Sequence, residues 1–294
     1  MRHRAALAIL AGWMVLAAGC VVEQPAEEEK PEAKEGPLTI AVCPKGTMHV
    51  FWKSIHAGAK QAEKELEDVT IQWQGPVVED QREAQINLVE TFIQKRVDGI
   101  VLAPLDSKAL VSPVRRAKAA GIPVVIIDSA LADEDAYVSF VATDNYKGGV
   151  LGAQRLADLL EPEGGKVVLM RYQVGSASTD NRERGFMDEI KKHERIEVIS
   201  SDLYARATVE SAMETAQALL SKYGDKADGI FCPNESSAYG MLRALVESGR
   251  AGKIKYVGFD SSERLVEGLE KGHIHGLVVQ NPFRMGHDGV ETIV

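Results

Sequence analysis

Cysteine is scarce in this sequence, and its placement excludes a zinc-finger type of site. Three of the 294 residues are Cys, at positions 20, 43 and 232, and no two of them have the close spacing of zinc ligands. Cys43 and Cys232 each lie near the end of an apolar run. We interpret them as two buried small hydrophobic side chains, with a disulfide in an oxidising compartment as the alternative. We expect no structural metal and no cofactor.

An excess of positive charge is also missing. The 34 Lys and Arg residues are outnumbered by 43 Asp and Glu residues, so the formal net charge is −9. Loss of residues 1–19 would remove Arg2 and Arg4 but no acid, which takes the charge to −11. A chain of that charge is not drawn to phosphate backbones or to an anionic membrane surface. We therefore expect no nucleic-acid partner.

The chain begins with a short apolar segment rather than a membrane-spanning one. Residues 5–16 are apolar, follow the positively charged start and precede the small residues 17–19. A segment of this length is too short to cross a bilayer about 30 Å thick, and the pattern is typical of an export signal. Cys20 follows directly, and the array resembles a bacterial lipobox, although Ala17 stands where leucine is commonest. We predict a signal peptide at 1–19 and lipidation of Cys20, with localisation in the periplasm or on the outer face of the cell envelope.

The segment that follows Cys20 contains too few apolar residues to fold. Residues 23–37 are rich in acids and contain no aromatic residue, so they bury too little surface to offset the entropy of ordering. We predict an acidic, disordered tether at 20–37.

From residue 38 the sequence alternates short β-rich runs with amphipathic helical stretches. Continuous apolar runs such as VVII are typical of strands buried on both faces. The predicted strands are 38–43, 69–73, 99–103, 123–127, 138–142, 166–170, 196–200, 229–232, 255–259 and 274–279. The predicted helices are 51–66, 81–95, 107–120, 147–160, 182–192, 209–222, 236–248 and 262–271. This alternation predicts an α/β fold with parallel sheets, and the number of strands favours two doubly wound lobes.

Polar and aromatic side chains follow the predicted strands. In such sheets a ligand lies beyond the carboxyl ends of the strands. The residues at those ends are Lys45, Asp106, Asp128, Asp144, Asn145, Tyr172, Tyr204, Asn234, Asp260 and Gln280. Carboxylates and amides pair with hydroxyl groups, and an aromatic face covers the C–H side of a sugar ring. The set therefore indicates a neutral, hydroxyl-rich ligand.

Six short segments together resemble one known family. They are Phe51-Trp52, GIPVVIID at 121–128, TDN at 143–145 with the glycines 148 and 149, NRERGF at 181–186, FCPNE at 231–235 and VGFD at 257–260. Their order and spacing, from residue 38 to 294, are similar to those of ribose-type periplasmic sugar-binding proteins of ABC importers. The resemblance implies two lobes joined by a hinge, with an N-terminal lobe of 38–143 and 281–294 and a C-terminal lobe of 144–280. The chain stops at Val294 inside an apparent further helix, so we expect the family's terminal strand and third crossing to be missing.

The resemblance also implies ligand contacts, position by position. Phe51 and Trp52 would stack on the sugar, and Asp128 would accept hydroxyl protons in the same lobe. From the other lobe Arg182 would donate to two ligand oxygens, and Tyr204 would cover the opposite ring face. The remaining donors and acceptors would be Asn234, Asp260 and Gln280.

Three of these assignments have purely structural alternatives. The aromatic pair at 51 and 52 also suits core packing at a helix start. Arg182 also suits a surface ion pair, and Asp260 also suits the first turn of a helix, where an acid is favourable.

Two positions depart from the ribose-binding pattern. Ser129 follows Asp128 where ribose binders have an arginine, and His49 stands where they have an asparagine. Without the bidentate donor we expect ribose to bind weakly. Lys45 and His49 lie on the same loop and add donors that suit a ketose, a polyol, or an acidic or phosphorylated sugar.

Other functions find less support in the sequence. The seven histidines have no recognisable nucleophile or acid–base partner motif, although Asp128 and Asp260 are a conceivable glycosidase pair and His273 and His275 a conceivable metal pair. A sugar-responsive transcription regulator would need a helix-turn-helix segment before residue 38. A third alternative keeps the fold and presents the ligand to a sensor or chemoreceptor. We predict a monomeric, non-enzymatic protein that passes a small carbohydrate to the permease subunits of an ABC importer.

The predicted anchor gives a direct test. Two or three acyl chains make membrane residence stable, whereas one gives marginal attachment. In a bacterial host we expect Cys20→Ala to move the protein from the detergent phase to the aqueous phase of a Triton X-114 partition. Equal partitioning of the variant and the wild type would contradict lipidation.

Overall fold

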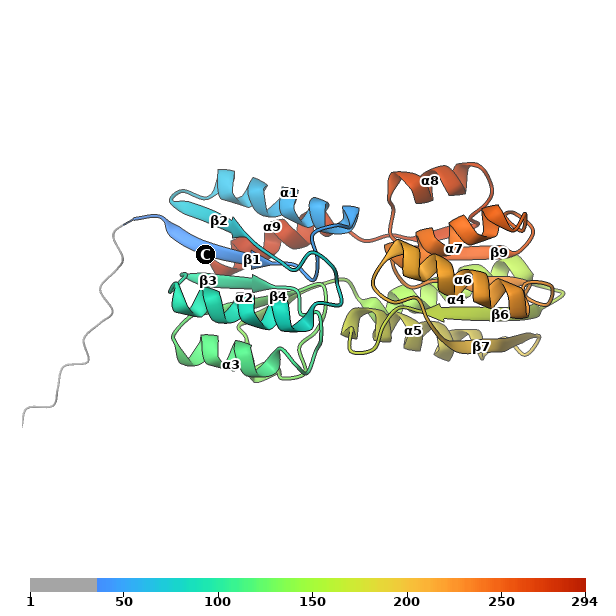
Figure 1. Cartoon of the computed structure of the whole chain (residues 1–294), viewed down its shortest axis with the longest axis horizontal. Helices are drawn as coiled ribbons and strands as arrows, with labels where there is room; N and C mark the ends of the chain where they lie inside the picture. The colour runs from blue at the N-terminus through green and yellow to red at the C-terminus, as the bar shows by residue number, and fades with distance from the viewer. Residues whose placement is uncertain (1–35) are drawn as a thin grey trace, which may run out of the picture. The chain divides into compact units, whose positions relative to one another are not determined.

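The computed structural model describes residues 36–294, which form two α/β lobes (Figure 1). The predicted signal peptide, Cys20 and most of the predicted tether lie outside the described residues. Within 36–294, no helix combines the length and the apolar character needed to cross a membrane.

The first lobe is built on a sheet of parallel strands in the order β2-β1-β3-β4-β5. The strands are β1 (Leu38–Cys43), β2 (Val69–Trp73), β3 (Gly99–Leu102), β4 (Val124–Ile127) and β5 (Ser139–Val141). The helices of this lobe are α1 (Val50–Glu65), α2 (Arg82–Gln94), α3 (Val111–Ala119), a short 3-10 helix (Glu134–Ala136) and α9 (Pro282–Ile293).

The second lobe repeats the same plan. Its parallel strands lie in the order β10-β9-β8-β6-β7. They are β6 (Gly165–Arg171), β7 (Ile196–Tyr204), β8 (Gly229–Phe231), β9 (Lys255–Phe259) and β10 (Gly276–Val278). The helices are α4 (Asn145–Leu160), α5 (Ala177–Ile190), α6 (Val209–Tyr223), α7 (Glu235–Glu247) and α8 (Glu263–Glu270). Read from its other edge, this order is β7-β6-β8-β9-β10. If β6 to β10 are matched in chain order to β1 to β5, it is the same as the order in the first lobe. This confirms the predicted pair of doubly wound lobes.

Both faces of each sheet are buried, which explains why the strands read as continuous apolar runs. In β1, Ile40 and Val42 pack into the core between the sheet and helix α1, and Ala41 and Cys43 pack into the core on the opposite face. Successive side chains of a strand point to opposite faces, so each face needs its own apolar residues. The second lobe has the same two cores, one shared with α4 and α5 and the other with α6, α7 and α8.

Helix α9 completes the first lobe although it comes last in the chain. Figure 1 shows it, in red, beside the blue helix α1. The two helices approach closely through a reciprocal pair of glycines. A Cβ on Gly58 of α1 would lie 1.9 Å from the carbonyl oxygen of Phe283, and one on Gly286 of α9 would lie 2.0 Å from that of Ile55. Only glycine permits this backbone contact.

Helices α4 and α5 of the second lobe show the same arrangement. A Cβ on Gly149 would lie 1.9 Å from the carbonyl oxygen of Arg182, and one on Gly185 would lie 2.1 Å from that of Tyr146. The contact fixes α5 against α4 at Arg182, one of the predicted ligand-binding residues. The α1–α9 and α4–α5 pairs are therefore equivalent elements of the two lobes.

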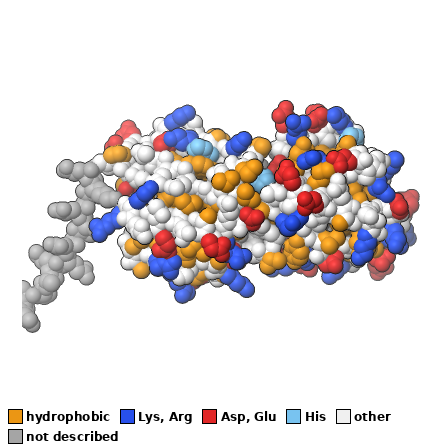
Figure 2. All heavy atoms as spheres, in the orientation of Figure 1, with side chains coloured by type: hydrophobic (Ala, Val, Ile, Leu, Met, Phe, Trp, Pro, Cys, Tyr) orange, Lys and Arg blue, Asp and Glu red, His pale blue; other side chains and the backbone are white. Residues whose placement is uncertain are grey.

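The cysteines at 43 and 232 are free, buried and in the cores of different lobes. Burial raises the pKa of each thiol to about 12. They act as small hydrophobic side chains, as the sequence indicates, rather than as a disulfide. On the face shown in Figure 2, acidic and basic side chains intermingle without an extended area of one sign.

Two element boundaries differ from the prediction and affect the site. Helix α5 begins at Ala177 rather than at Arg182, so Arg182 lies inside the helix. Strand β7 continues to Tyr204 rather than ending at Ser200. Its pairing with β6 shifts register twice. Such irregularities allow the strand to continue through the polar Ser-Ser-Asp stretch, which in the sequence reads as a strand end.

The glycine contact between α1 and α9 predicts a specific loss of stability. Alanine favours a helix by about 1 kcal/mol over glycine, but in Gly58→Ala the new methyl group meets a backbone oxygen that has no freedom to rotate aside. We expect a net loss of about 1–3 kcal/mol in the free energy of unfolding, measured by urea denaturation. The control is Lys53→Ala on the exposed face of the same helix, which we expect to change stability little. An unchanged Gly58→Ala would contradict the close packing.

Candidate ligand-binding site

A small cavity lies where the carboxyl ends of both sheets face each other. Its volume is about 30 Å³, and side chains of both lobes line it. The lining residues are Lys45, His49, Phe51, Trp52, Glu79, Asp128, Tyr172, Ser176, Ser178, Thr179, Arg182, Asn234, Glu235, Ser236, Asp260 and Gln280. The structure thus brings together all the predicted ligand contacts except Ser129 and Tyr204.

Two aspartates occupy equivalent positions in the two lobes. Asp128 follows β4 and Asp260 follows β9, which are matching strands. Both have positive φ, 61° and 72°, and the backbone N–H of each donates to the next strand, to Val141 at 3.1 Å and Val278 at 2.7 Å. Aspartate tolerates this conformation better than most residues. The shared turn directs one carboxylate from each lobe into the cavity.

Lys45 joins the lobes from the end of β1. Its Nζ lies 3.0 Å from Asp128 Oδ2 in its own lobe and donates to Ser178 Oγ at 3.0 Å and Ser176 Oγ at 3.2 Å in the other. The lysine is almost fully buried, so its charge needs these partners. All three ammonium protons therefore have acceptors, two of them across the cleft.

Glu79 is a central residue that the sequence analysis missed. It lies on the loop between β2 and α2 and accepts hydrogen bonds from Trp52 Nε1 at 2.8 Å and from the hydroxyl of Tyr172, in the second lobe, at 2.9 Å. Gln173 donates to its carbonyl oxygen at 2.9 Å. The indole N–H of Trp52 is thus used by protein. Applying the strand-end rule to β2 would have drawn attention to this loop.

His49 contacts the second lobe at both ring nitrogens. Nε2 lies 3.1 Å from the carbonyl oxygen of Ala207 and 3.5 Å from Glu79 Oε1, and Nδ1 lies 3.2 Å from Glu235 Oε2. Burial alone would lower the pKa of His49, but the hydrogen bond to Glu235 and the charges of Glu79 and Glu235 outweigh it and raise the pKa to about 9. His49 is therefore an imidazolium at neutral pH.

Arg182 holds one unused donor at the cavity. Its Nε donates to Asn145 Oδ1 at 2.8 Å and its Nη1 to the carbonyl oxygen of Pro233 at 3.0 Å, while the guanidinium carbon lies 4.0 Å from the centre of the Phe259 ring. Nη2 is buried and has no hydrogen-bond partner. Its nearest carboxylate oxygen among the ion pairs, Oδ1 of Asp128, is 4.0 Å away. A buried donor without a partner is unfavourable by about 1–3 kcal/mol, so this nitrogen is suited to a ligand oxygen.

Asp260 is held by donors from its own lobe. The backbone N–H of Glu235 donates to Oδ2 at 2.9 Å, and Gln280 Nε2 donates to Oδ1 at 2.6 Å. Burial raises the pKa of Asp260 to about 6, although the charge of Arg182 and the hydrogen bond from Gln280 act in the opposite direction. Gln280 also accepts from Thr143 Oγ1 at 2.8 Å. This bond joins the two segments, after β5 and after β10, by which the chain crosses between the lobes.

Asn234 reaches the cavity from the start of α7 and has a structural role there. It is the N-cap residue, and its Oδ1 accepts from Ser237 Oγ at 2.6 Å while its Nδ2 donates to Ser236 Oγ at 3.0 Å. Phe51 and Trp52 make an edge-to-face pair with ring centres 5.0 Å apart. Trp52 is buried and belongs to the core beside α1, with Phe51 packed against it. The packing alternative therefore holds for both rings, and both also line the cavity.

Ser129 and Tyr204 lie outside the cavity lining. Ser129 is buried, and its Oγ accepts from the backbone N–H of Ser178 at 3.1 Å, so it bridges the lobes. Tyr204 lies at the end of the extended strand β7, beneath the guanidinium of Arg171, 5.7 Å from its ring centre. The aromatic residue of the second lobe that does line the cavity is Tyr172, which follows β6.

Seven lining residues were not among the predicted contacts. They are Glu79, Tyr172, Ser176, Ser178, Thr179, Glu235 and Ser236. Three of them belong to the start of α5, which the sequence analysis placed several residues later. Tyr172 is among the predicted strand-end residues, whereas the family resemblance implies Tyr204 as the aromatic contact of this lobe.

The lining is suited to binding rather than to covalent chemistry. Lys45 is ion-paired with Asp128 and donates to both Ser176 and Ser178, so it serves these hydroxyls as a donor and not as a base. An unactivated hydroxyl is a weak nucleophile. The charged lining residues are Lys45, His49 and Arg182 against Glu79, Asp128, Glu235 and Asp260. These charges nearly balance, so a neutral ligand leaves no buried charge unpaired.

A family model described as a periplasmic binding protein domain matches residues 40–294. The chain belongs to this family. It is 30% identical over 260 residues to the D-allose-binding periplasmic protein of Escherichia coli (strain K12), an alignment that covers 86% of this chain and 83% of that protein.

Solved structures of this family share the fold closely. An ABC transporter solute-binding protein from Agrobacterium vitis with bound D-fucose has a TM-score of 0.83 and 37% identity, covering 87% of this chain and 88% of that one. A carbohydrate transporter solute-binding protein from Agrobacterium radiobacter in complex with D-arabinose has a TM-score of 0.84 and 32% identity, covering 88% of each chain. These relatives are sugar-binding transport proteins rather than enzymes, which agrees with the chemistry of the cavity.

The imidazolium of His49 predicts a pH-dependent stability. Its pKa is about 9 in the folded protein against about 6.5 for an unperturbed imidazole, so the stabilisation is complete below pH 6.5 and is lost as the pH rises through 9. We expect the free energy of unfolding of the wild type to fall by up to roughly 3 kcal/mol more than that of His49→Gln over this range.

Urea denaturation at several pH values between 6.5 and 9 measures this difference. Other titrating groups, such as Glu183 and the two thiols, are present in both proteins, so the comparison isolates His49. Parallel pH profiles would show that His49 carries no extra proton in the folded cleft.

Proposed function

We propose that this protein is an extracytoplasmic solute-binding protein that captures a small neutral carbohydrate between its lobes and delivers it to an ABC importer. The observation that carries the proposal is the buried Arg182 Nη2, a hydrogen-bond donor without a partner at a cavity lined by both lobes. Family membership and the sugar ligands of the relatives support the same conclusion.

The charge balance of the cavity supports a neutral pentose, hexose or polyol rather than an acidic or phosphorylated sugar. Arg182 Nη2 and the carboxylates of Asp128 and Asp260 are the groups that we assign to ligand hydroxyls. Phe51 and Tyr172 are the aromatic residues that we assign to the apolar faces of the ring. The relatives named above bind D-allose, D-fucose and D-arabinose, which fall in this class.

Ligand entry requires the lobes to separate. A volume of about 30 Å³ holds about two water molecules, and a monosaccharide is much larger. Lys45, His49 and Glu79 bond directly to the second lobe, and these bonds must break for the cleft to open. We infer that sugar hydroxyls then replace part of this polar network, so that the lobes close on the ligand by hinge motion at the crossings near Thr143 and Gln280.

The anchor and the monomeric state belong to the same proposal. The signal pattern and Cys20 support attachment to the cell envelope through lipid. A lipid-anchored binder remains close to a membrane-embedded permease, which raises the effective concentration of loaded protein at the importer.

A sugar panel tests the proposed function. We expect at least one of D-allose, D-fucose, D-arabinose, D-tagatose, D-ribose and xylitol to raise the melting temperature, because a ligand at 100 times its Kd stabilises by about 2.7 kcal/mol. Ribose is expected to be weaker than the best sugar, since Ser129 supplies no guanidinium. No stabilisation by any member of a panel extended to other neutral monosaccharides and polyols would overturn the proposal.

A variant of Arg182 tests the site with the best sugar from that panel. Arg182→Lys keeps the charge but removes the planar fork, so we expect at least a tenfold rise in Kd by isothermal titration calorimetry. Arg184→Lys, on the exposed side of the same helix, is the matched control. Equal affinities in the two variants would place the sugar away from Arg182.

A further inference from the structure

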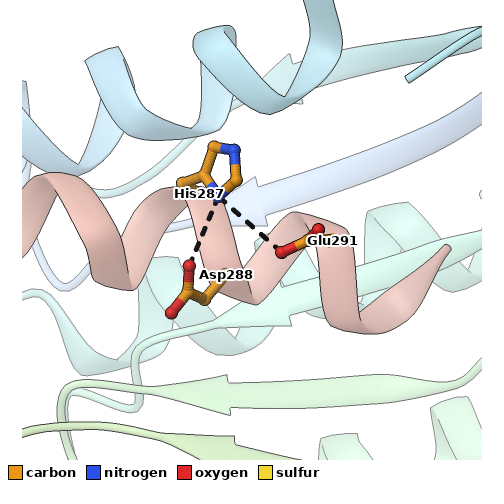
Figure 3. Close-up of side chains that lie close together, drawn as sticks. All are labelled: His287, Asp288 and Glu291. Carbon is orange, nitrogen blue, oxygen red and sulfur yellow. Dashed lines mark hydrogen bonds and ion pairs between the residues drawn. The ribbon is translucent and has the colours of Figure 1, made fainter. Parts of the chain in front are cut away.

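A second group of polar side chains lies on helix α9, apart from the cavity. The donor atoms of His287, Asp288 and Glu291 lie near one another, and dashed lines in Figure 3 join both carboxylates to the same imidazole nitrogen. Each offers one ligand atom, and these atoms all lie within 4.8 Å of one another. None of the three residues lines the sugar cavity.

The other nitrogen of His287 has a partner of its own. Nε2 lies 2.7 Å from Glu65 Oε2 at the end of α1, and Oε1 of Glu65 accepts from Gln61 at 2.6 Å. Nδ1 faces Asp288 Oδ1 at 3.3 Å, which is a hydrogen bond when Nδ1 carries a proton, and a metal ion bound there would take the place of that proton. In metal sites the histidine ligand commonly donates its second N–H to a carboxylate in this way, which fixes both the tautomer and the orientation of the ring.

The two histidine–carboxylate separations are close to those of a zinc site. Zinc bonds of about 2.0–2.1 Å in tetrahedral geometry place two ligand atoms about 3.3–3.4 Å apart. Nδ1 lies 3.3 Å from Asp288 Oδ1 and 3.9 Å from Glu291 Oε2. The second separation must shorten by about half an ångström, and the two carboxylate oxygens, which lie within 4.8 Å of each other, must also come closer to this spacing. Glu291 is free to move because its side chain is 63% exposed.

The surroundings hold the other ligands in place and favour a cation. Arg284 donates to Asp288 Oδ2 at 2.9 Å and leaves Oδ1 available. The close contact of α9 with α1 at Gly58 and Gly286 fixes the backbone next to His287. Apart from the imidazole itself, three carboxylates and one guanidinium give a local charge of −2, which attracts a divalent ion.

We propose that His287 Nδ1, Asp288 and Glu291 bind one Zn²⁺ ion, with water in the remaining coordination position and Glu65 as the partner that orients the histidine. The site lies on the first lobe and is independent of the sugar site. The sequence analysis missed this site because it considered only pairs of cysteines and of histidines. A site of one histidine and two carboxylates has no such spacing. Glu65, moreover, lies 222 residues from His287.

Zinc titration of the untagged full-length protein tests this site. We expect one equivalent of Zn²⁺ to bind with a Kd in the micromolar range, measured by competition with a chromophoric chelator. His287→Gln is expected to raise the Kd at least tenfold, and Glu291→Gln is expected to raise it severalfold. Because Glu291 is exposed, its variant folds normally even if substitution of the half-buried His287 disturbs the helix pair.

His193→Gln provides the matched control. His193 is another surface histidine with one carboxylate neighbour, Glu161 at 3.7 Å, and it belongs to no three-ligand cluster in residues 36–294. We expect this variant to bind zinc as the wild type does. Absence of micromolar zinc binding, or an affinity unchanged by both α9 substitutions, overturns the proposal. An equal loss in the His193 variant does so as well, because it indicates non-specific surface binding.

Discussion

Burial of charge is the constraint on which the cleft depends. Glu79, Asp128 and Lys45 lie in the interior, where an unpaired charge is strongly unfavourable. Each obtains part of its compensation from its own lobe, and Lys45 and Glu79 obtain the rest from Ser178 and Tyr172 across the cleft. The closed arrangement is thus held by polar groups that require partners, and a ligand able to supply those partners competes for the same positions.

The two lobes share the same three structural features. Each has the same strand order, an aspartate with positive φ after its fourth strand, and a glycine-mediated helix pair. The specific chemistry lies in the differences. Where the first lobe places Lys45 after its first strand, the second places Tyr172, so an ammonium group in one lobe corresponds to a phenol in the other.

The fold could be predicted from the sequence to a large extent, because parallel strands buried on both faces leave continuous apolar runs. The site could be predicted only in part. Asp128, Asp260 and Arg182 lie in segments that resemble a known family, whereas Glu79 lies on a loop with no such pattern. Tyr204 belongs to β7 and does not follow it, because the polar stretch inside this strand reads in the sequence as a strand end. Ser178 was missed because α5 starts earlier than its apolar periodicity indicates. In each case the position of the residue depends on strand pairing or on contacts with residues far away in the sequence.

The position of α9 has a consequence for the order of folding. The second lobe is formed by one continuous segment, from α4 to β10, and its contacts close within that segment. The first lobe gains its full core only when α9 packs against α1, after the whole second lobe has been synthesised. Long-range closure of this kind is slow, so on the ribosome the second lobe completes its structure first and the first lobe remains unfinished until α9 emerges.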